Sequence, residues 1–349
     1  MPEKYSPFNE SEIGRWDDFV ESHPKGSPFH LSGWIRTIYE TYAFEPLLYI
    51  CKDGGGKISG VLPFFLIKSF ITGTRIVSLP FSDYGGPLFS NGEEGKDLLE
   101  RIREERNNRI RYFEIRGFLS NNCGFVEHNY YKRHVLQLFP DPEKVLKKVD
   151  KRTIQYSVRK AQRQLVEVRE ENNQQGMEEL YRLNKLTRMK HGIPSQPLKF
   201  FRALLENIVL KGNASILLAL YDRKVIAAGF FLKFKETFYY KYNASDPNYL
   251  SKVTANHLLT WRAIEKACQE GYLFFDFGRT SPDNSGLMRY KEMWGANPSE
   301  LPYFYYPGIK GTSSIEERNI IYRMLTAIWR RLPDRLIETI GPAILKHSA

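Results

Sequence analysis

The sequence has few cysteines and no long apolar run. Its three cysteines, Cys51, Cys123 and Cys268, lie far apart, and such a sparse, odd number suits a reducing compartment better than a disulfide framework. The longest apolar run, 225–232, is too short to cross a bilayer. Residues 1–12 carry three glutamates and no apolar core, which argues against a signal peptide. These absences predict a soluble, cytoplasmic protein.

The motifs of several enzyme classes are also missing. The sequence contains no His-Glu-x-x-His, no paired-cysteine motif and no EF-hand loop, so we expect no metal site. It contains neither a Gly-x-Ser-x-Gly elbow nor a P-loop. No glycine-rich pyrophosphate loop follows the third strand expected in either half. This last absence counts against an ordinary acetyl-CoA enzyme, but not against another acyl donor.

Positive charge is plentiful. The 349 residues carry a formal net charge of +11, which favours an anionic partner such as a nucleic acid, a nucleotide-linked or pyrophosphate-linked substrate, or a membrane surface. Simple solubility is the alternative explanation. DNA is not expected, because no known DNA-binding module accompanies the charge.

Two halves of the chain show the same order of expected elements. In the first half, a glycine-rich hairpin at 52–57 joins the first two strands; the strands are expected at 47–51, 58–67, 75–79 and 111–116, and a polar helix at 95–107. In the second half, the strands are expected at 215–221, 225–234, 237–243 and 273–277, and a helix at 254–270. Thr254 is a plausible N-cap of this helix, and Gly271 is a plausible residue just beyond its C-terminus. This order resembles the core of GNAT acyltransferases.

The repeat predicts an α/β (α+β) fold of two tandem GNAT-like lobes with mixed, mostly antiparallel sheets. We expect the lobes over 1–145 and 146–310. A helical, amphipathic tail at 311–349 should follow, with an apolar stripe at Ile321, Leu325, Ile328 and Leu332. We expect the tail to pack back on the first lobe, because such a stripe normally faces a core. Contact with an anionic membrane surface is the alternative.

A basic helix is expected where the second lobe opens. Residues 144–169 contain nine basic and two acidic residues. The positions that would form the buried face are Ile154, Val158, Ala161 and Leu165. The arginines that would share the opposite face are Arg152, Arg159 and Arg163. Such a row suits phosphate groups, because each guanidinium offers paired donors; a solvated helix face is the alternative.

Several segments resemble one family over nearly the whole chain. They are residues 29–34, 78–86, 275–280, 322–342 and the run Tyr290-Lys291-Glu292-Met293-Trp294-Gly295. Together they resemble the FemAB-like proteins associated with exosortase/PEP-CTERM systems, a branch of the FemABX superfamily. The resemblance implies a transferase that moves an aminoacyl group from aminoacyl-tRNA to a peptidoglycan precursor. For this branch it implies a role in envelope or exopolysaccharide assembly.

The resemblance also implies catalytic residues. Lys291 matches a family lysine thought to stabilise an oxyanion, although Tyr290 stands where phenylalanine is usual. Acyl transfer to an amine passes through a tetrahedral oxyanion, and the amine must lose a proton. Asp276 and Asp83 are the candidates to assist that proton transfer. The alternatives are a surface lysine for Lys291, a strand-end cap for Asp276 and an ordinary turn residue for Asp83.

Further residues are candidates for substrate binding. Tyr84, Gly85 and Gly86 suit a loop whose backbone approaches a ligand. Arg279 follows a strand end, where sites tend to gather, and Tyr242 is a further candidate. Trp34 would stack on a base or sugar if it were not a core residue, the commoner fate of tryptophan.

Three functions remain open from the sequence. The first is an acyl- or aminoacyltransferase that forms an amide on a cell-envelope glycan or peptide precursor. The second is an N-acyltransferase of an amino sugar or amino acid that uses a CoA thioester. The third is a non-catalytic assembly factor that binds an anionic, lipid-linked precursor. The expected co-substrate is aminoacyl-tRNA or acyl-CoA, with no resident cofactor. The chain lacks the coiled-coil arm of some family members, which weakens the case for tRNA.

Overall fold

The computed structural model describes residues 3–4, 10–70, 73–90, 99–100, 102–104, 110–119, 123–250, 252–308, 341 and 344–347. These residues form two compact units. The first contains the described residues up to Tyr130, together with 301–308 and 344–347. The second is Tyr131–Glu300.

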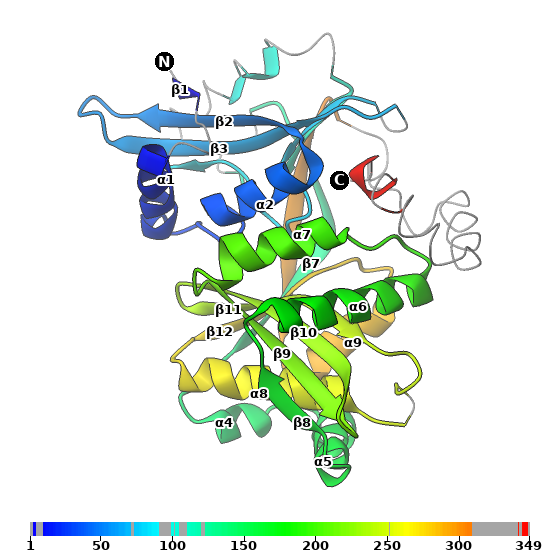
Figure 1. The fold of residues 1–349 in the computed structure, drawn as a ribbon. Coiled ribbons are helices and arrows are strands. Elements are labelled where there is room, and N and C mark those ends of the chain that lie inside the picture. The colour runs from blue at the N-terminus through cyan, green and yellow to red at the C-terminus, as the bar shows by residue number, and fades with distance from the viewer. Residues whose placement is uncertain are drawn as a thin grey trace. The chain divides into compact units, whose positions relative to one another are not determined.

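The first unit is a six-stranded sheet with helices packed against it (Figure 1). Its helices are α1 (Glu10–Ser22) and α2 (Ser32–Tyr42). Its strands are β1 (Glu3–Lys4), β2 (Glu45–Lys52), β3 (Ile58–Ile67), β4 (Arg75–Ser78), β6 (Tyr112–Arg116) and the last part of β13 (Asn297–Tyr306), with β5 (Leu88–Phe89) paired to β3. The order is β1-β2-β3-β4-β6-β13, and only β4 and β6 run parallel.

Buried apolar residues of the sheet form the core of the first unit. All ten residues of β3 are buried, as in strands that are covered on both faces. Gly56 takes a φ of 77° in the hairpin between β2 and β3, a conformation that glycine adopts at little cost. One core cluster joins Leu62 and Phe64 of β3 and Phe113 of β6 to Leu99 and Ile102. The described residues of the expected helix at 95–107 are helical.

The second unit contains most of the helices (Figure 1). Its strands are β7 (Val126–Gln137, from Tyr131 onward), β8 (Glu167–Glu170), β9 (Ala214–Tyr221), β10 (Lys224–Phe234), β11 (Thr237–Ser245) and β12 (Phe274–Thr280). Its helices are α4 (Pro142–Leu146), the π-helical turn η1 (Lys151–Gln155), α5 (Tyr156–Arg163), α6 (Gln174–His191), α7 (Leu198–Leu204), the π-helical turn η2 (Leu205–Val209), α8 (Ala255–Gln269) and α9 (Ser285–Met293). The sheet order is β8-β9-β10-β11-β12-β7, and again only one pair, β11 and β12, is parallel.

The expected repeat is therefore confirmed, and the two sheets share one strand order. The predicted strands and the predicted hairpin form at or within a few residues of their expected bounds. The last strand of each sheet comes from the other half of the sequence: β7 follows β6 in the chain but pairs with β12, and β13 follows α9 but pairs with β6. The fold is a mixed, mostly antiparallel α/β structure.

This exchange corrects the expected boundaries. The units divide at residues 130 and 131, inside β7, and not at 145 and 146. Residues 301–308 belong to the first unit, although we expected them in the second lobe. Pairing between distant strands sets both boundaries, so local patterns of apolar residues do not reveal them.

Two local expectations also need correction. The basic helix ends at Arg163, so Leu165 has a φ of 58° and is 82% exposed instead of lying on the buried face. Thr254 stands at the N-cap of α8, but its hydroxyl donates to the carbonyl of Ser157 (2.6 Å) and does not cap the helix. Gly271 has a φ of 83°, as expected for a residue just beyond a helix end.

The apolar stripe of the tail lies outside the described residues. Of the tail, residues 341 and 344–347 are described, and residues 344–347 belong to the first unit. The carbonyl of His347 accepts a hydrogen bond from Arg75 (2.9 Å), and its ring packs on Phe70. Among the described residues, no helix is long and apolar enough to cross a membrane.

Candidate active site

The parallel strands of the second unit separate toward their C-terminal ends. The ladder between β11 and β12 contains three residue pairs and ends at Tyr239 and Asp276. Beyond this point β11 continues to Ser245 along β10, while β12 continues to Thr280 along β7. The ends of parallel strands in α/β sheets are a common position for ligands. The separation therefore marks this end of β12 as the place to look for chemistry.

A β-bulge shapes this end of β12. Asp276 pairs with Val135, but Arg279 pairs with Arg133, so β12 has one more residue than β7 in this interval. Gly278 lies in the bulge with a φ of 72°, a conformation that costs other residues energy. Bulges re-aim the groups of a strand and are frequent beside active sites. Here the bulge turns backbone carbonyls toward α9.

Asp276 is held on both of its carboxylate oxygens. Oδ2 accepts a hydrogen bond from Nε of Arg133 (2.7 Å), and Oδ1 accepts one from the amide of Gly278 (2.7 Å). The side chain of Asp276 is 1% exposed, and that of Arg133 is 25% exposed. These contacts favour a role in fixing the bulge over a role as proton acceptor.

Lys291 is the one buried residue of α9. Its Nζ donates to the carbonyl oxygens of Gly278 (2.9 Å) and Arg279 (3.2 Å). Trp294, fully buried beside Phe277, anchors the end of the helix. A lysine head is rarely buried without such partners. The ammonium is therefore preorganised at the end of β12, and the alternative of a surface lysine is wrong, because Lys291 is buried.

His134 on β7 lies opposite the bulge and is fully buried. Burial, and to a smaller extent the nearby charge of Lys291, lower the pKa of its ring from 6.5 to about 4. Within the described part of the chain, neither ring nitrogen of His134 nor Oγ1 of the buried Thr280 has a hydrogen-bond partner. His134 is thus neutral near pH 7, and it adds no second positive charge beside Lys291.

Arg279 lies next to this cluster, and Tyr242 does not contact it. The guanidinium of Arg279 lies 4.3 Å from the centre of the Tyr131 ring, a cation–π contact. Tyr242, on β11, packs among Phe200, Phe201 and Phe230. It is 7% exposed, so little of its ring is available to a ligand.

The expected arginine row is exposed. Arg152 on η1 and Arg159 and Arg163 on α5 face solvent, opposite the buried residues Val158 and Ala161. This arrangement agrees with the amphipathic pattern of the sequence. It fits both a phosphate-binding row and a solvated face.

The remaining predicted residues belong to the first unit. Trp34 is fully buried and packs edge-on against Phe29 at 5.0 Å, so it is a core residue with no exposed face for a base or sugar. Tyr84 packs on the same phenylalanine at 5.6 Å.

Hydrogen bonds hold the loop that contains the other predicted residues. The carbonyl of Asp83 accepts from the hydroxyl of Tyr303 (2.6 Å), the amide of Gly85 donates to Arg116, and the carbonyl of Gly86 lies 2.8 Å from Nε2 of His30. A Cβ at Gly85 would lie 2.4 Å from Leu79, so close packing requires glycine there. Asp83 belongs to the first unit, whereas Asp276 and Lys291 belong to the second.

The sequence analysis missed Arg133 and His134. Both lie on β7, which we did not expect to be a strand. The available signal was the run 126–137, which contains neither glycine nor proline and includes two adjacent tyrosines and two valines, as strands often do.

Comparisons with known proteins agree with this geometry. Residues 149–292 match the family described as "Acetyltransferase (GNAT) domain". No protein of curated function matches the sequence. Among solved structures, one titled "Crystal structure of FemX" is similar with a TM-score of 0.67 and 16% identity over 88% of this chain and 97% of that one.

Two further structures show the same fold. The C-terminal domain of a putative lysylphosphatidylglycerol synthetase from Agrobacterium fabrum has a TM-score of 0.59 and 12% identity, over 86% of this chain and 93% of that one. A tandem GNAT protein from the clavulanic acid biosynthesis pathway has a TM-score of 0.54 and 11% identity, over 89% and 99%. The fold is therefore tandem and GNAT-like, the matched domain lies in the second unit, and the protein is an acyltransferase.

Proposed function

We propose that the protein transfers an aminoacyl or other acyl group to an amine on a cell-envelope glycan or peptide precursor, with Lys291 at the reacting carbonyl. The observation that carries the proposal is the buried ammonium of Lys291, which the bulge carbonyls fix at the end of β12. A fixed cation in a site of low polarity stabilises an oxyanion with little reorganisation. The resemblance to FemAB-like proteins and the FemX-like fold support the choice of substrate class.

The proposed reaction balances as a simple substitution. The amine nitrogen attacks the acyl carbonyl, and the carbonyl oxygen becomes negative near Nζ of Lys291. The bond to the leaving group, a ribose oxygen or a thiolate, then breaks and restores the carbonyl. The amine loses one proton, and the leaving group takes one up. Asp276 fixes the bulge that holds Lys291.

Cells provide the first test. Mass spectrometry of envelope glycan and peptide precursors, in cells with and without the gene, should reveal one precursor that lacks an acyl group in the deletion strain. Wild-type protein should restore the product, and Lys291→Met should not. Lys211→Met, at an exposed lysine of the same unit, is the matched control and should restore it. Full restoration by Lys291→Met would refute the proposed role of Lys291.

A second candidate function is a CoA-dependent N-acyltransferase, which the GNAT domain match favours. The segment between β11 and α8, residues 246–254, contains no glycine, so it is not a glycine-rich loop of the kind that could hold the pyrophosphate of CoA on its backbone amides. Glycine-rich loops bind phosphates through closely approaching backbone amides. A rise in melting temperature on adding acetyl-CoA would favour this second function, and an unchanged temperature would favour aminoacyl-tRNA or another donor.

We propose that the arginine row, Arg152, Arg159 and Arg163, binds phosphate groups. The phosphates would belong to an anionic or lipid-linked precursor or to aminoacyl-tRNA, and a lipid-linked precursor would bring the row to an anionic membrane surface. Arg159→Ala should weaken binding of the precursor found in the cell comparison and leave the melting temperature unchanged, because the side chain is exposed. Arg202→Ala, at an exposed arginine on α7, is the control. If wild type and Arg159→Ala bound the precursor with equal affinity at low salt, the arginine row would be a solvated helix face and not a phosphate-binding site.

The association with exosortase systems is proposed from the resemblance alone. If it holds, deletion of the gene should alter exopolysaccharide or envelope assembly in a host that has such a system. An unchanged envelope in that host would separate this protein from the branch it resembles.

A further inference from the structure

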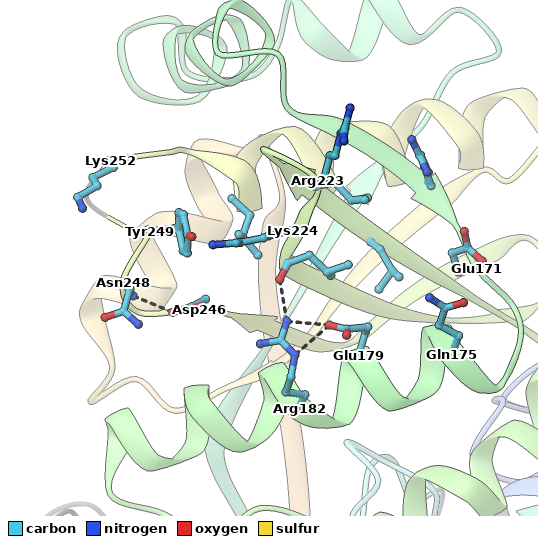
Figure 2. Close-up of a pocket in the computed structure, with 15 residues that line it drawn as sticks. Glu171, Gln175, Glu179, Arg182, Arg223, Lys224, Asp246, Asn248, Tyr249 and Lys252 are labelled. Atoms are coloured by element: carbon cyan, nitrogen blue, oxygen red, sulfur yellow. Dashed lines mark hydrogen bonds and ion pairs between the residues drawn. The ribbon is translucent and has the colours of Figure 1, made fainter.

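The second unit contains a cavity of about 710 Å³ that Lys291 and Asp276 do not line. It is formed by β8, α6, the hairpin between β9 and β10, and the loop that follows β11 (Figure 2). In the strand order, β8 to β10 lie on the other side of β11 from β12. The cavity is therefore separate from the candidate active site, although both belong to one unit.

Positive charge dominates the lining of this cavity. Its basic residues are Arg169, Arg182, Arg223, Lys224 and Lys252. Its acidic residues are Glu171, Glu179 and Asp246. The excess of cations makes the cavity attractive to anions.

The basic residues fall into two groups. Arg169 pairs with Glu167 (2.6 Å), and Arg182 pairs with Glu179 (2.7 Å) and donates to the carbonyl of Val225. In contrast, the side chains of the other three cations, Arg223, Lys224 and Lys252, make no ion pair or hydrogen bond with any residue that the structure describes. These three come from two segments, the hairpin turn and the loop after β11.

The hairpin turn carries an unfavourable residue. Asp222 and Arg223 have φ values of 50° and 60°. Turns with two such residues strongly prefer asparagine, aspartate or glycine, and arginine is a poor choice. Strained backbone at a cavity is a reason to look for function. The arginine here places a guanidinium at the rim, which glycine would not supply.

We propose that this cavity binds a diphosphate-bearing ligand. Arg223 and Lys224 adjoin in the turn, and Lys252 faces the cavity from a second segment, so more than one anionic group can be met at once. The guanidinium of Arg223 suits phosphate oxygens, which it can bind in pairs. The volume lies in the range of small-molecule sites.

Tyr249 suggests where a base would lie if the ligand is a nucleotide. Its ring lines the cavity, is half-buried, and packs against Tyr221 at 6.3 Å. Figure 2 shows the side chain of Lys224 extending toward it. An aromatic face beside phosphate-binding cations fits a nucleoside diphosphate. A diphosphate on another carrier would use the cations and leave Tyr249 unused.

Calorimetric titration of the full chain with inorganic pyrophosphate at low salt tests the site. The double variant Arg223→Gln/Lys224→Gln should raise the Kd at least about tenfold, the scale of one lost charged hydrogen bond. The control Lys199→Gln/Arg202→Gln removes the same charges from exposed positions on α7 outside the cavity, and its Kd should stay within about twofold of wild type. No binding by wild type, or equal losses in both variants, would overturn the proposal. The readout needs no acyl transfer, so it stands apart from the proposed function.

A second titration identifies the carrier. If a nucleoside diphosphate binds more tightly than pyrophosphate, and Tyr249→Leu removes that difference, the natural ligand carries a base. If both probes bind equally and Tyr249→Leu changes neither, the diphosphate comes from another carrier. Both results agree with a diphosphate-binding cavity and differ only in the group that carries the diphosphate. Tighter binding that Tyr249→Leu leaves intact, together with an unchanged Kd in Arg223→Gln/Lys224→Gln, would place the ligand elsewhere.

Discussion

The two units have the same strand order, but the equivalent strands β6 and β12 differ at their C-terminal ends. In each, one parallel pair holds a buried carboxylate at the same register: Glu114 opposite Val77 in the first unit, and Asp276 opposite Tyr239 in the second. Each carboxylate also pairs with an arginine. The common scaffold therefore fixes a buried ion pair at equivalent positions.

The source of the arginine differs. Glu114 pairs with Arg116 (2.6 Å) on its own strand, and both side chains are less than 10% exposed. The equivalent of Arg116 in β12 is Gly278, and the arginine that pairs with Asp276 comes from β7. The strand β6 stays paired with β13 through Arg116, whereas β12 bulges at Gly278.

This difference explains where chemistry can arise. In the first unit the arginine fills the end of the strand, and its guanidinium reaches the carbonyl of Ser82 and the ring of Tyr303. In the second unit β12 bulges at Gly278, and Lys291 from α9 donates hydrogen bonds to the carbonyl oxygens of Gly278 and Arg279. The same end of the strand thus holds a buried arginine in the first unit and a buried lysine in the second.

The largest expected effect compares the two ion pairs. Glu114→Gln should lower the free energy of unfolding by about 3 kcal/mol, because the buried guanidinium of Arg116 would lose the carboxylate of Glu114. Asp276→Asn should cost less, about 1–2 kcal/mol, because Arg133 is 25% exposed and can reach water. Urea denaturation of both variants measures the difference. Equal losses would show that the two pairs are energetically alike.

The next effect should appear in turnover. Lys291→Met should lower kcat about 100-fold, the usual scale for one oxyanion-stabilising group, with little change in KM because the interaction forms mainly in the transition state. Lys291→Arg should restore kcat only in part, because a planar guanidinium places its charge differently. Loss of the donor to Gly278 should also cost about 1 kcal/mol of stability. Steady-state kinetics with the identified precursor, with Lys211→Met as the control, measure this effect. An unchanged kcat in Lys291→Met would show that Lys291 has only a structural role.

Acid should affect the second unit first. Burial lowers the pKa of His134 and His257 from 6.5 to about 4, so between these values the unfolded chain binds protons that the folded unit does not. Stability is therefore full above about pH 6.5 and falls toward pH 4, by about 1.4 kcal/mol per pH unit for each histidine. In the first unit, burial raises the pKa of Asp17 above 3.8, so acid there relieves the cost of burying a charge.

Hydrogen exchange followed peptide by peptide, corrected for the intrinsic effect of pH, can compare the two units. Peptides from α8 and β7 should lose protection before peptides from α1 and β3. His257→Gln should flatten the pH dependence of the second unit, with Gln164→Ala, a change that removes no titrating group, as the control. Simultaneous loss of protection in both units would contradict the assignment to these histidines.

The sequence predicted elements with local signatures and missed those that depend on distant pairing. Alternating and apolar runs predicted β2, β3, β9 and β10, and the glycines at 54–56 predicted their hairpin. The exchange of β7 and β13 has no local signature, because each strand pairs with residues more than a hundred positions away. The same limit applies to the site: Lys291 came from a motif resemblance, whereas His134 and Arg133 become neighbours of Lys291 and Asp276 only after this exchange.

The smallest expected effect concerns Gly278, which lies in the bulge of β12 at the position equivalent to Arg116 of β6. Gly278→Ala places a side chain at a φ of 72° and should cost about 1–2 kcal/mol of stability. Gly271→Ala is the matched control, because its φ is 83° and an added Cβ meets nothing within 4 Å. The strain is similar at the two positions, but only Gly278 donates to Asp276 and accepts from Lys291.

Both variants should therefore lose a similar amount of stability, and only Gly278→Ala should lose turnover, by about tenfold, because the bulge would shift Lys291. Gly117→Ala changes a glycine at the end of β6 in the first unit, where φ is 98° and the new Cβ would lie 3.1 Å from Tyr84; it should lower stability and leave kcat close to that of wild type. Denaturation and steady-state kinetics of the three variants give both readouts. If Gly278→Ala kept the kcat of Gly271→Ala, the bulge would only connect strands, and the chemical difference between the units would have to originate in α9 alone.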